Sequence, residues 1–162
     1  MERNIRPIII AFIIFSIPYF SVGTQATNIL LTEEVVTRYE STYPDIWKLT
    51  KKLEEIGKMK ESDEKTKKTL EITAQREEIL KAKGWTDLWE YLDTMARVQE
   101  ALIPLLVLDK FTNTPEDRRK KAEEGVKEQL KNKEFSEEEI TVMTKHFPML
   151  KKMLQEAGNI PK

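Results

Sequence analysis

The single histidine, His146, is the residue best suited by type to acid–base chemistry, and the chain has no cysteine. On a helix, a side chain meets the residues three and four positions away. For His146 these are Val142, Met143, Met149 and Leu150, so no carboxylate on its own helix can pair with the ring. We therefore expect a partly buried structural histidine. Two or more carboxylates converging on His146 in one pocket would favour an enzyme instead.

Other catalytic patterns are missing from the sequence. It contains no Gly-rich phosphate loop, no His-Glu-x-x-His and no Gly-x-Ser-x-Gly. Glutamate pairs such as Glu54 with Glu55 stand among lysines and arginines, which is typical of solvated helix faces. We expect no catalytic residue, no metal site and no cofactor, hence a protein that is not an enzyme. The alternative is a carboxylate-dependent enzyme without a recognisable motif.

Aromatic residues offer a second candidate site. They could line a groove for a protein, peptide or lipid partner. The alternative is an ordinary helical core, because aromatic residues at helical spacing usually pack inside. The residues proposed for the groove are Trp47, Trp85, Trp89, Tyr43 and Phe147.

Charge gives little reason to expect nucleic acid as a partner. The net charge is −1. The one basic run, residues 118–121, is flanked by Glu116, Asp117, Glu123 and Glu124 at helical neighbour spacings. We therefore expect a self-paired, solvated helix face and no nucleic-acid binding.

Residues 1–26 have the pattern of a secretory signal peptide. Two arginines precede the uncharged, mostly apolar stretch 7–20, which is short for a membrane-spanning helix. Cleavage after Ala26 would leave a mature chain that begins at Thr27, and Gly23 ends a second possible site. We expect a periplasmic or secreted protein without stable membrane insertion after processing. An uncleaved signal anchor, which would tether the protein to the membrane, is the alternative.

The remaining residues, 27–162, are expected to form one all-α domain, a compact bundle of five to six helices. Gly57, Gly84 and Gly158 each follow a helical pattern, where glycine commonly ends a helix in the left-handed conformation. No stretch alternates apolar and polar residues as a strand would. The expected helices span about 33–42, 44–56, 64–83, 87–110, 115–132 and 137–157.

Helix starts are marked by capping residues. Ser136 with Glu139 forms a capping box, and Thr32 begins a similar start. Thr86 is expected to cap the helix that opens at Asp87. Thr114 is expected to cap the next one, with a proline at its first helical position.

The segment 87–110 is expected to be the central helix. One stripe carries Leu88, Leu92, Met95, Gln99, Leu102 and Leu106, and every residue from Ala101 to Leu108 is apolar. A helix that is apolar all round is usually buried. We therefore place this end in the middle of the bundle, with Leu102 and Leu106 in the core, and expect a bend at Pro104.

The C-terminal helix carries an apolar seam that should face a partner helix. Its members are spaced three and four residues apart. If the seam paired between two chains, the protein would be a structural homodimer. The seam residues are Ile140, Met143, Phe147, Leu150 and Leu154.

Residues 32–56 and 136–157 resemble each other and form a possible internal repeat. Both have a capped start, then an aromatic–proline pair, then a continuing amphipathic helix. Convergence is the alternative, since capping boxes are common. We expect a full break at Pro44 and only a kink at Pro148, because proline cannot donate to the carbonyl four residues back.

The start of the mature chain, Leu31-Thr32-Glu33-Glu34, resembles that of periplasmic stress chaperones of the Spy/CpxP type, whose Leu-Thr-x-x-Gln motif has Val35 here in place of Gln. The chain is also similar to small exported all-helical bacterial proteins of unassigned function, which share this start and an aromatic–proline turn. The resemblance implies an exported helical protein and no site residues. Our hypothesis is a non-enzymatic helical binding or adaptor protein of the cell envelope.

Overall fold

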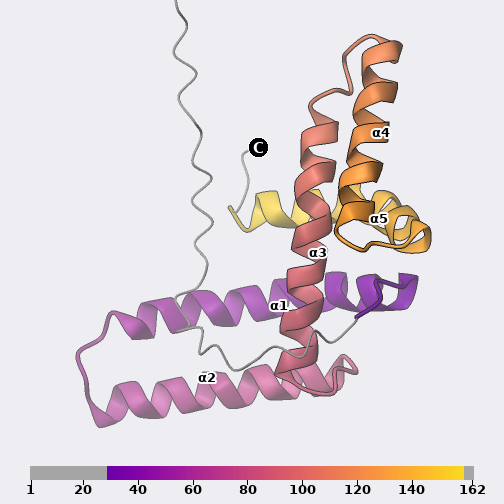
Figure 1. Ribbon diagram of the computed structural model, residues 1–162. Coiled ribbons are helices and arrows are strands. Elements are labelled where there is room, and N and C mark those ends of the chain that lie inside the picture. Colours follow the sequence, from indigo (N-terminus) through magenta and orange to yellow (C-terminus); the bar gives the residue numbers. More distant parts are fainter. Residues whose placement is uncertain (1–28, 159–162) are drawn as a thin grey trace, which may run out of the picture.

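The computed structural model describes residues 29–158, which are helical with short connections and contain no strand (Figure 1). The all-α prediction is thus confirmed for this part of the chain. The signal peptide expected at 1–26 lies outside the described residues. The five helices are α1 (Glu33–Gly57), α2 (Asp63–Ala82), α3 (Leu88–Asp109), α4 (Glu116–Asn132) and α5 (Glu137–Glu156).

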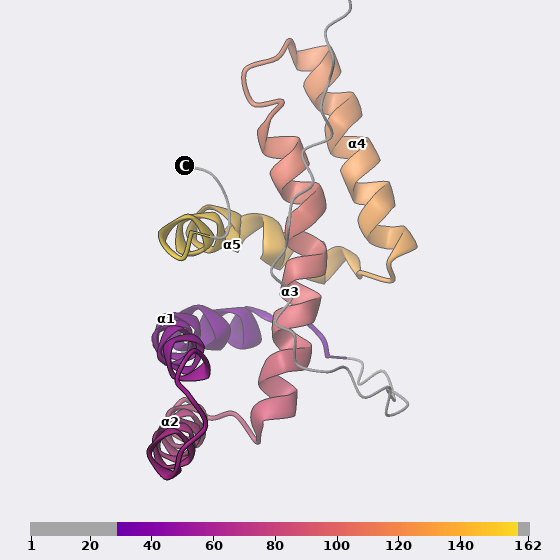
Figure 2. The ribbon, with the colours of Figure 1, turned by 90° about the vertical axis from the view of Figure 1, so that its left-hand side faces the viewer.

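The helices form two hairpins that lie crosswise. α1 pairs with α2, and α3 pairs with α4, while α5 packs against α1, α3 and α4 (Figures 1 and 2). α3 contacts each of the other four helices, as expected for the central helix. The core lies where the hairpins cross and includes Tyr39 of α1, Leu80 of α2, Val98 of α3 and Met143 of α5.

The predicted full break at Pro44 is wrong, because α1 runs through this proline without interruption. Tyr39, Tyr43 and Ile46 keep helical spacing across it, and all three are buried in the core. Pro44 itself is exposed, so the proline lies on the solvent-facing side of α1. Burial of this stripe therefore favours one long helix. Pro148 also lies inside a helix, α5, and is exposed.

Because α1 and α5 each run through their proline, the two proposed repeat units are compared as two unbroken helices. Both units begin with a capping residue, Thr32 or Ser136, that follows a fully or almost fully buried apolar residue, Leu31 or Phe135. The break expected within 32–56 is not found, and α5 likewise continues through Pro148. A common origin of the units stays a prediction.

Two of the four predicted helix starts are confirmed. The hydroxyl of Thr32 accepts from Val35 N, and Ser136 forms the full capping box with Glu139. α3 is capped by Asp87 rather than Thr86. α4 follows Pro115 and has no side-chain cap, and the hydroxyl of Thr114 donates to the carbonyl of Phe111.

Two of the three predicted glycine ends are confirmed. Gly84 and Gly158 have φ angles of +82° and +74°, whereas Gly57 remains the last residue of α1 and has no positive φ. After α4 the left-handed position is taken by Glu134, at φ 62°. The Arg97 guanidinium donates to the carbonyls of Lys133 and Glu134 at 3.0 and 2.9 Å. These bonds hold the turn in a conformation that a side chain disfavours.

The buried face of α3 differs from the predicted stripe. The apolar residues it buries include Tyr91, Val98, Ala101, Leu102 and Leu105. Of the predicted stripe, Leu102 is in the core, whereas the others, Leu106 included, are only partly buried. The prediction counted the leucines and gave no weight to the tyrosine and valine on the neighbouring face.

The C-terminal half of α3 is also more exposed than predicted. Ile103 and Val107 are 48% and 49% exposed, although every residue from Ala101 to Leu108 is apolar. The placement of this end in the middle of the bundle is therefore wrong. The hairpin of α3 and α4 extends beyond the crossing (Figure 2), so only one side of α3 is covered there.

The seam of α5 does face partner helices, and they belong to the same chain. Ile140, Met143 and Leu150 are buried, and Phe147 and Leu154 pack against the core. A homodimer built on this seam would have to open the core.

Candidate functional site

The predicted aromatic groove is divided between the core and the surface. Tyr43 and Trp85 are buried, and Trp47 and Phe147 are partly buried against the core. Trp89 is 70% exposed. Although Trp85 and Trp89 are four residues apart, Trp85 precedes α3 and points inward. Among the described residues, the five aromatics therefore do not line one groove.

The buried members belong to a packed aromatic cluster. Tyr91 lies 5.3 Å from Trp85 in an edge-on arrangement and 5.8 Å from Tyr39 in a stacked one, measured between ring centroids. Tyr43 contacts Tyr39 and stacks on Trp47. Burial raises the pKa of Tyr39 and Tyr91 well above the usual value, so both phenols stay neutral. The cluster is part of the hydrophobic core and joins α1 to α3.

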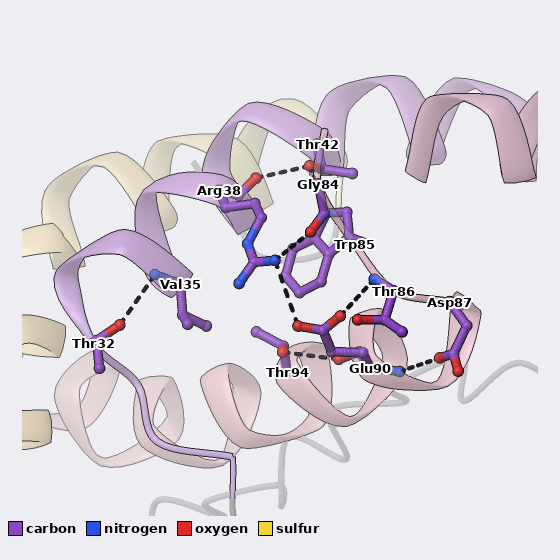
Figure 3. Close-up of polar contacts among 10 residues, drawn as sticks. All are labelled: Thr32, Val35, Arg38, Thr42, Gly84, Trp85, Thr86, Asp87, Glu90 and Thr94. Carbon is purple, nitrogen blue, oxygen red and sulfur yellow. Dashed lines mark hydrogen bonds and ion pairs between the residues drawn. The ribbon is translucent and has the colours of Figure 1, made fainter. Parts of the chain in front are cut away.

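Arg38 packs against Trp85, one member of this cluster (Figure 3). Its guanidinium lies 4.4 Å from the Trp85 ring centroid, donates to the Gly84 carbonyl at 2.6 Å and approaches Glu90 at 3.4 Å. The indole N–H of Trp85 donates to the buried hydroxyl of Thr42 at 2.9 Å. These contacts tie α1 to the α2–α3 turn and explain why Trp85 is not available to a ligand.

A different surface is open on α3. We call it the open face. Its members are within about 100° of one another around the helix, and none of residues 29–158 covers its exposed side chains. It consists of the exposed Trp89, Ala96, Ile103 and Val107 and the half-buried Leu92 and Leu106.

Two acidic residues border the open face. Asp93 is exposed, and Glu100 is partly exposed and forms an ion pair with Lys133 at 3.0 Å.

The open face spans about 27 Å from Trp89 to Val107, at 1.5 Å per helical residue. Sequence reasoning singled out Trp89 within it. The remainder was missed because the apolar run 101–108 was taken as buried.

His146 lies between two carboxylates of another helix. Its Nδ1 is 3.0 Å from Glu40 Oε1, and its Nε2 is 2.9 Å from Glu33 Oε1. Lys145 Nζ also donates to Glu33 Oε1, at 2.6 Å. The expectation of a partly buried histidine is met, and its own helix offers no carboxylate partner, as predicted. Its partners come from α1 and were not foreseen.

The electrostatics favour the charged histidine. Burial alone lowers the pKa of His146, but the hydrogen bonds to Glu33 and Glu40 and their negative charges outweigh it, so the pKa is raised above its ordinary value. Hydrogen bonds from Lys145 and then His146 lower the pKa of Glu33. Each group therefore stabilises the charged form of the other.

This arrangement is unlike a catalytic base or a metal site. Each ring nitrogen is occupied by a carboxylate, whereas a catalytic histidine keeps one nitrogen for the reacting group. Glu33 and Glu40 lie against opposite nitrogens, so the two carboxylates and one nitrogen cannot close on the same ion. Among residues 29–158, no group of three acidic, histidine or cysteine residues could hold a metal.

Two surface hollows among residues 29–158 lie away from His146. One, of about 460 Å³, is at the α3–α4 turn beside Thr112 and Arg119, where Arg119 is paired with Glu123. Another, of about 450 Å³, is between α1 and α2 beside Ile56 and Ile72. Neither of these two includes His146 or any of the five aromatics, so neither is the pocket that the enzyme alternative would need.

No protein-family model, no curated protein and no solved structure matches the chain. Within the part that the structure describes, none of the helices has the length and apolar character needed to cross a membrane.

Proposed function

We propose that this protein is an exported, non-enzymatic helical binding or adaptor protein of the cell envelope, and that the open face of α3 binds an amphipathic helix of a protein partner. The observation that carries the proposal is the incomplete burial of an all-apolar run: Ile103 and Val107 lie half exposed within it. Exposed apolar surface that a fold leaves uncovered is typical of interaction sites.

The shape of the open face suits a helix. It is a ridge about 27 Å long on one side of α3, and the small Ala96 near its middle allows close approach of a second backbone. Glu100 on its border is already paired with Lys133 and Arg97, so the apolar ridge rather than charge supports the choice of partner.

Cross-linking in intact cells tests the binding surface. A photoreactive residue at position 103 is expected to capture a second protein, whereas the same group at the exposed Glu128 of α4 serves as the control. Val107→Asp should abolish the adduct. With the purified partner helix, this variant should bind roughly tenfold or more weakly. It removes two methyl groups that the complex would bury and places a charge without a partner in an apolar contact.

Three other results would contradict the proposal. An adduct of twice the chain mass would indicate a homodimer, and an adduct with lipid alone would indicate a membrane-facing surface. Equal labelling at 103 and 128 would mean that the open face has no specific occupant.

Export has its own test, motivated by the pattern of residues 1–26. Protein released by osmotic shock is expected to begin at Thr27 on N-terminal sequencing, and Ala26→Pro should prevent that cleavage. A chain that begins at Thr24 would indicate the alternative site. A chain that begins at Met1 and resists carbonate extraction from membranes would contradict processing and favour the anchor.

A further inference from the structure

Glu33, Glu40 and His146 join the start of α1 to the middle of α5. The two glutamates are seven residues apart, two helical turns, and so lie on the same side of α1. The imidazole fits between them, with contacts of 2.9 and 3.0 Å on its two nitrogens. The side chains of His146 and Glu40 are only 11% and 15% exposed, whereas Glu33 is 50% exposed.

Only one protonation state satisfies both contacts. The imidazolium has an N–H on each nitrogen and can donate to both carboxylates, whereas the neutral ring has one N–H. In the neutral ring, a nitrogen lone pair would face a carboxylate oxygen at about hydrogen-bond distance, which is repulsive. The neutral ring must therefore give up one of the two contacts.

The surrounding charges point the same way. The groups that act on His146 are Glu33 and Glu40 from α1, and Lys145 of α5 shares Glu33. α3 and α4 also pack against α5, and no residue of either is among the described groups that shift the pKa of His146. With the imidazolium, two positive charges balance two negative ones. With the neutral ring, the four side chains together carry one surplus negative charge.

We infer that Glu33, His146 and Glu40 form a pH-sensitive clamp between α1 and α5, which is closed when His146 is an imidazolium and loosened when it is neutral. The clamp is independent of the binding surface proposed for α3. α1 and α5 are also joined by the ion pair of Lys145 with Glu33, so the clamp is one of several contacts between the two helices.

The direction of the pH dependence follows from linkage. In the unfolded chain the pKa of His146 returns to about 6.5. Because the folded pKa is higher, the contribution of His146 to stability is complete below that value and disappears as the pH rises through the folded pKa. The pKa of Glu33 is lowered on folding, so its contribution is present above its ordinary pKa and disappears as the pH falls through the folded one. The clamp is thus strongest in mildly acidic solution.

The single histidine makes the test direct, because its Hε1 resonance is the only one of its kind in the NMR spectrum. The titration midpoint of His146 is expected above 6.5, and Glu33→Gln and Glu40→Gln should each move it to lower pH. Lys152→Gln, which removes the distant pair with Glu156, is the control and should leave it in place.

Urea unfolding tests the consequence. The difference in midpoint between the wild type and His146→Gln should be larger at pH 6 than at pH 9. If His146→Gln does not fold, Glu40→Gln, which keeps the histidine, takes its place. A wild-type titration midpoint at or below 6.5, a midpoint unmoved by both glutamate variants, or an unfolding difference independent of pH would overturn the inference.

Discussion

Glu139→Ala is expected to lower the free energy of unfolding by roughly 3 kcal/mol, because one buried carboxylate serves three segments. Its side chain is 3% exposed. Its oxygens accept from the backbone of Ser136 at 2.9 Å and of Leu31 at 3.2 Å, and Arg97 Nε of α3 lies 3.5 Å away. Alanine would leave the buried N–H of Leu31 without a partner and break the capping box of α5.

The neighbouring Glu138 provides the control. It lies in the same helical turn but is exposed, so Glu138→Ala should change the free energy of unfolding by no more than about 0.5 kcal/mol. Urea unfolding of both variants at pH 7 is the measurement. If both variants lose equally little stability, the contacts from Glu139 to Leu31 and Arg97 do not stabilise the protein.

Glu139 also illustrates what the sequence could predict. Its capping box with Ser136 is local, since all its atoms lie within four residues, and the pattern Ser-Glu-Glu-Glu indicates it. The same holds for the cap at Thr32 and the left-handed glycines at 84 and 158, and hence for most helix bounds. The second contact of Glu139, to Leu31, spans 108 residues and has no local signal.

The candidate site shows the same limit. His146 and its carboxylate partners are 113 and 106 residues apart in sequence. Its own helix has no carboxylate at the relevant spacings, so local reasoning found no partner. The full break expected at Pro44 failed for a related reason: the local cost of the proline is outweighed by burial of Tyr39, Tyr43 and Ile46 against other helices.

The open face was missed because the composition of a helix does not say how much of it its neighbours cover. An apolar run such as 101–108 predicts burial on every side. The length of the α3–α4 hairpin beyond the crossing, which leaves one side open, depends on how the two hairpins cross. That arrangement is fixed by contacts between distant segments and cannot be read from any single helix.

Leu102→Ala is expected to lower the free energy of unfolding by about 2–5 kcal/mol, since truncating a core leucine removes apolar contacts and leaves a cavity. Leu102 is 3% exposed and lies in the core, whereas its neighbour Ile103 is 48% exposed. One residue turns the side chain by about 100° around the helix, from the core to the open face. Ile103→Ala is therefore the matched control and should cost less than about 1 kcal/mol. Urea unfolding at fixed pH measures both.

A loss below about 0.5 kcal/mol for Leu102→Ala, or equal losses for both variants, would mean that the buried face of α3 is not the one described. A large loss for Leu102→Ala with a small one for Ile103→Ala would show that Ile103 contributes little to folding, which leaves its side chain free to bind the partner helix proposed for the open face.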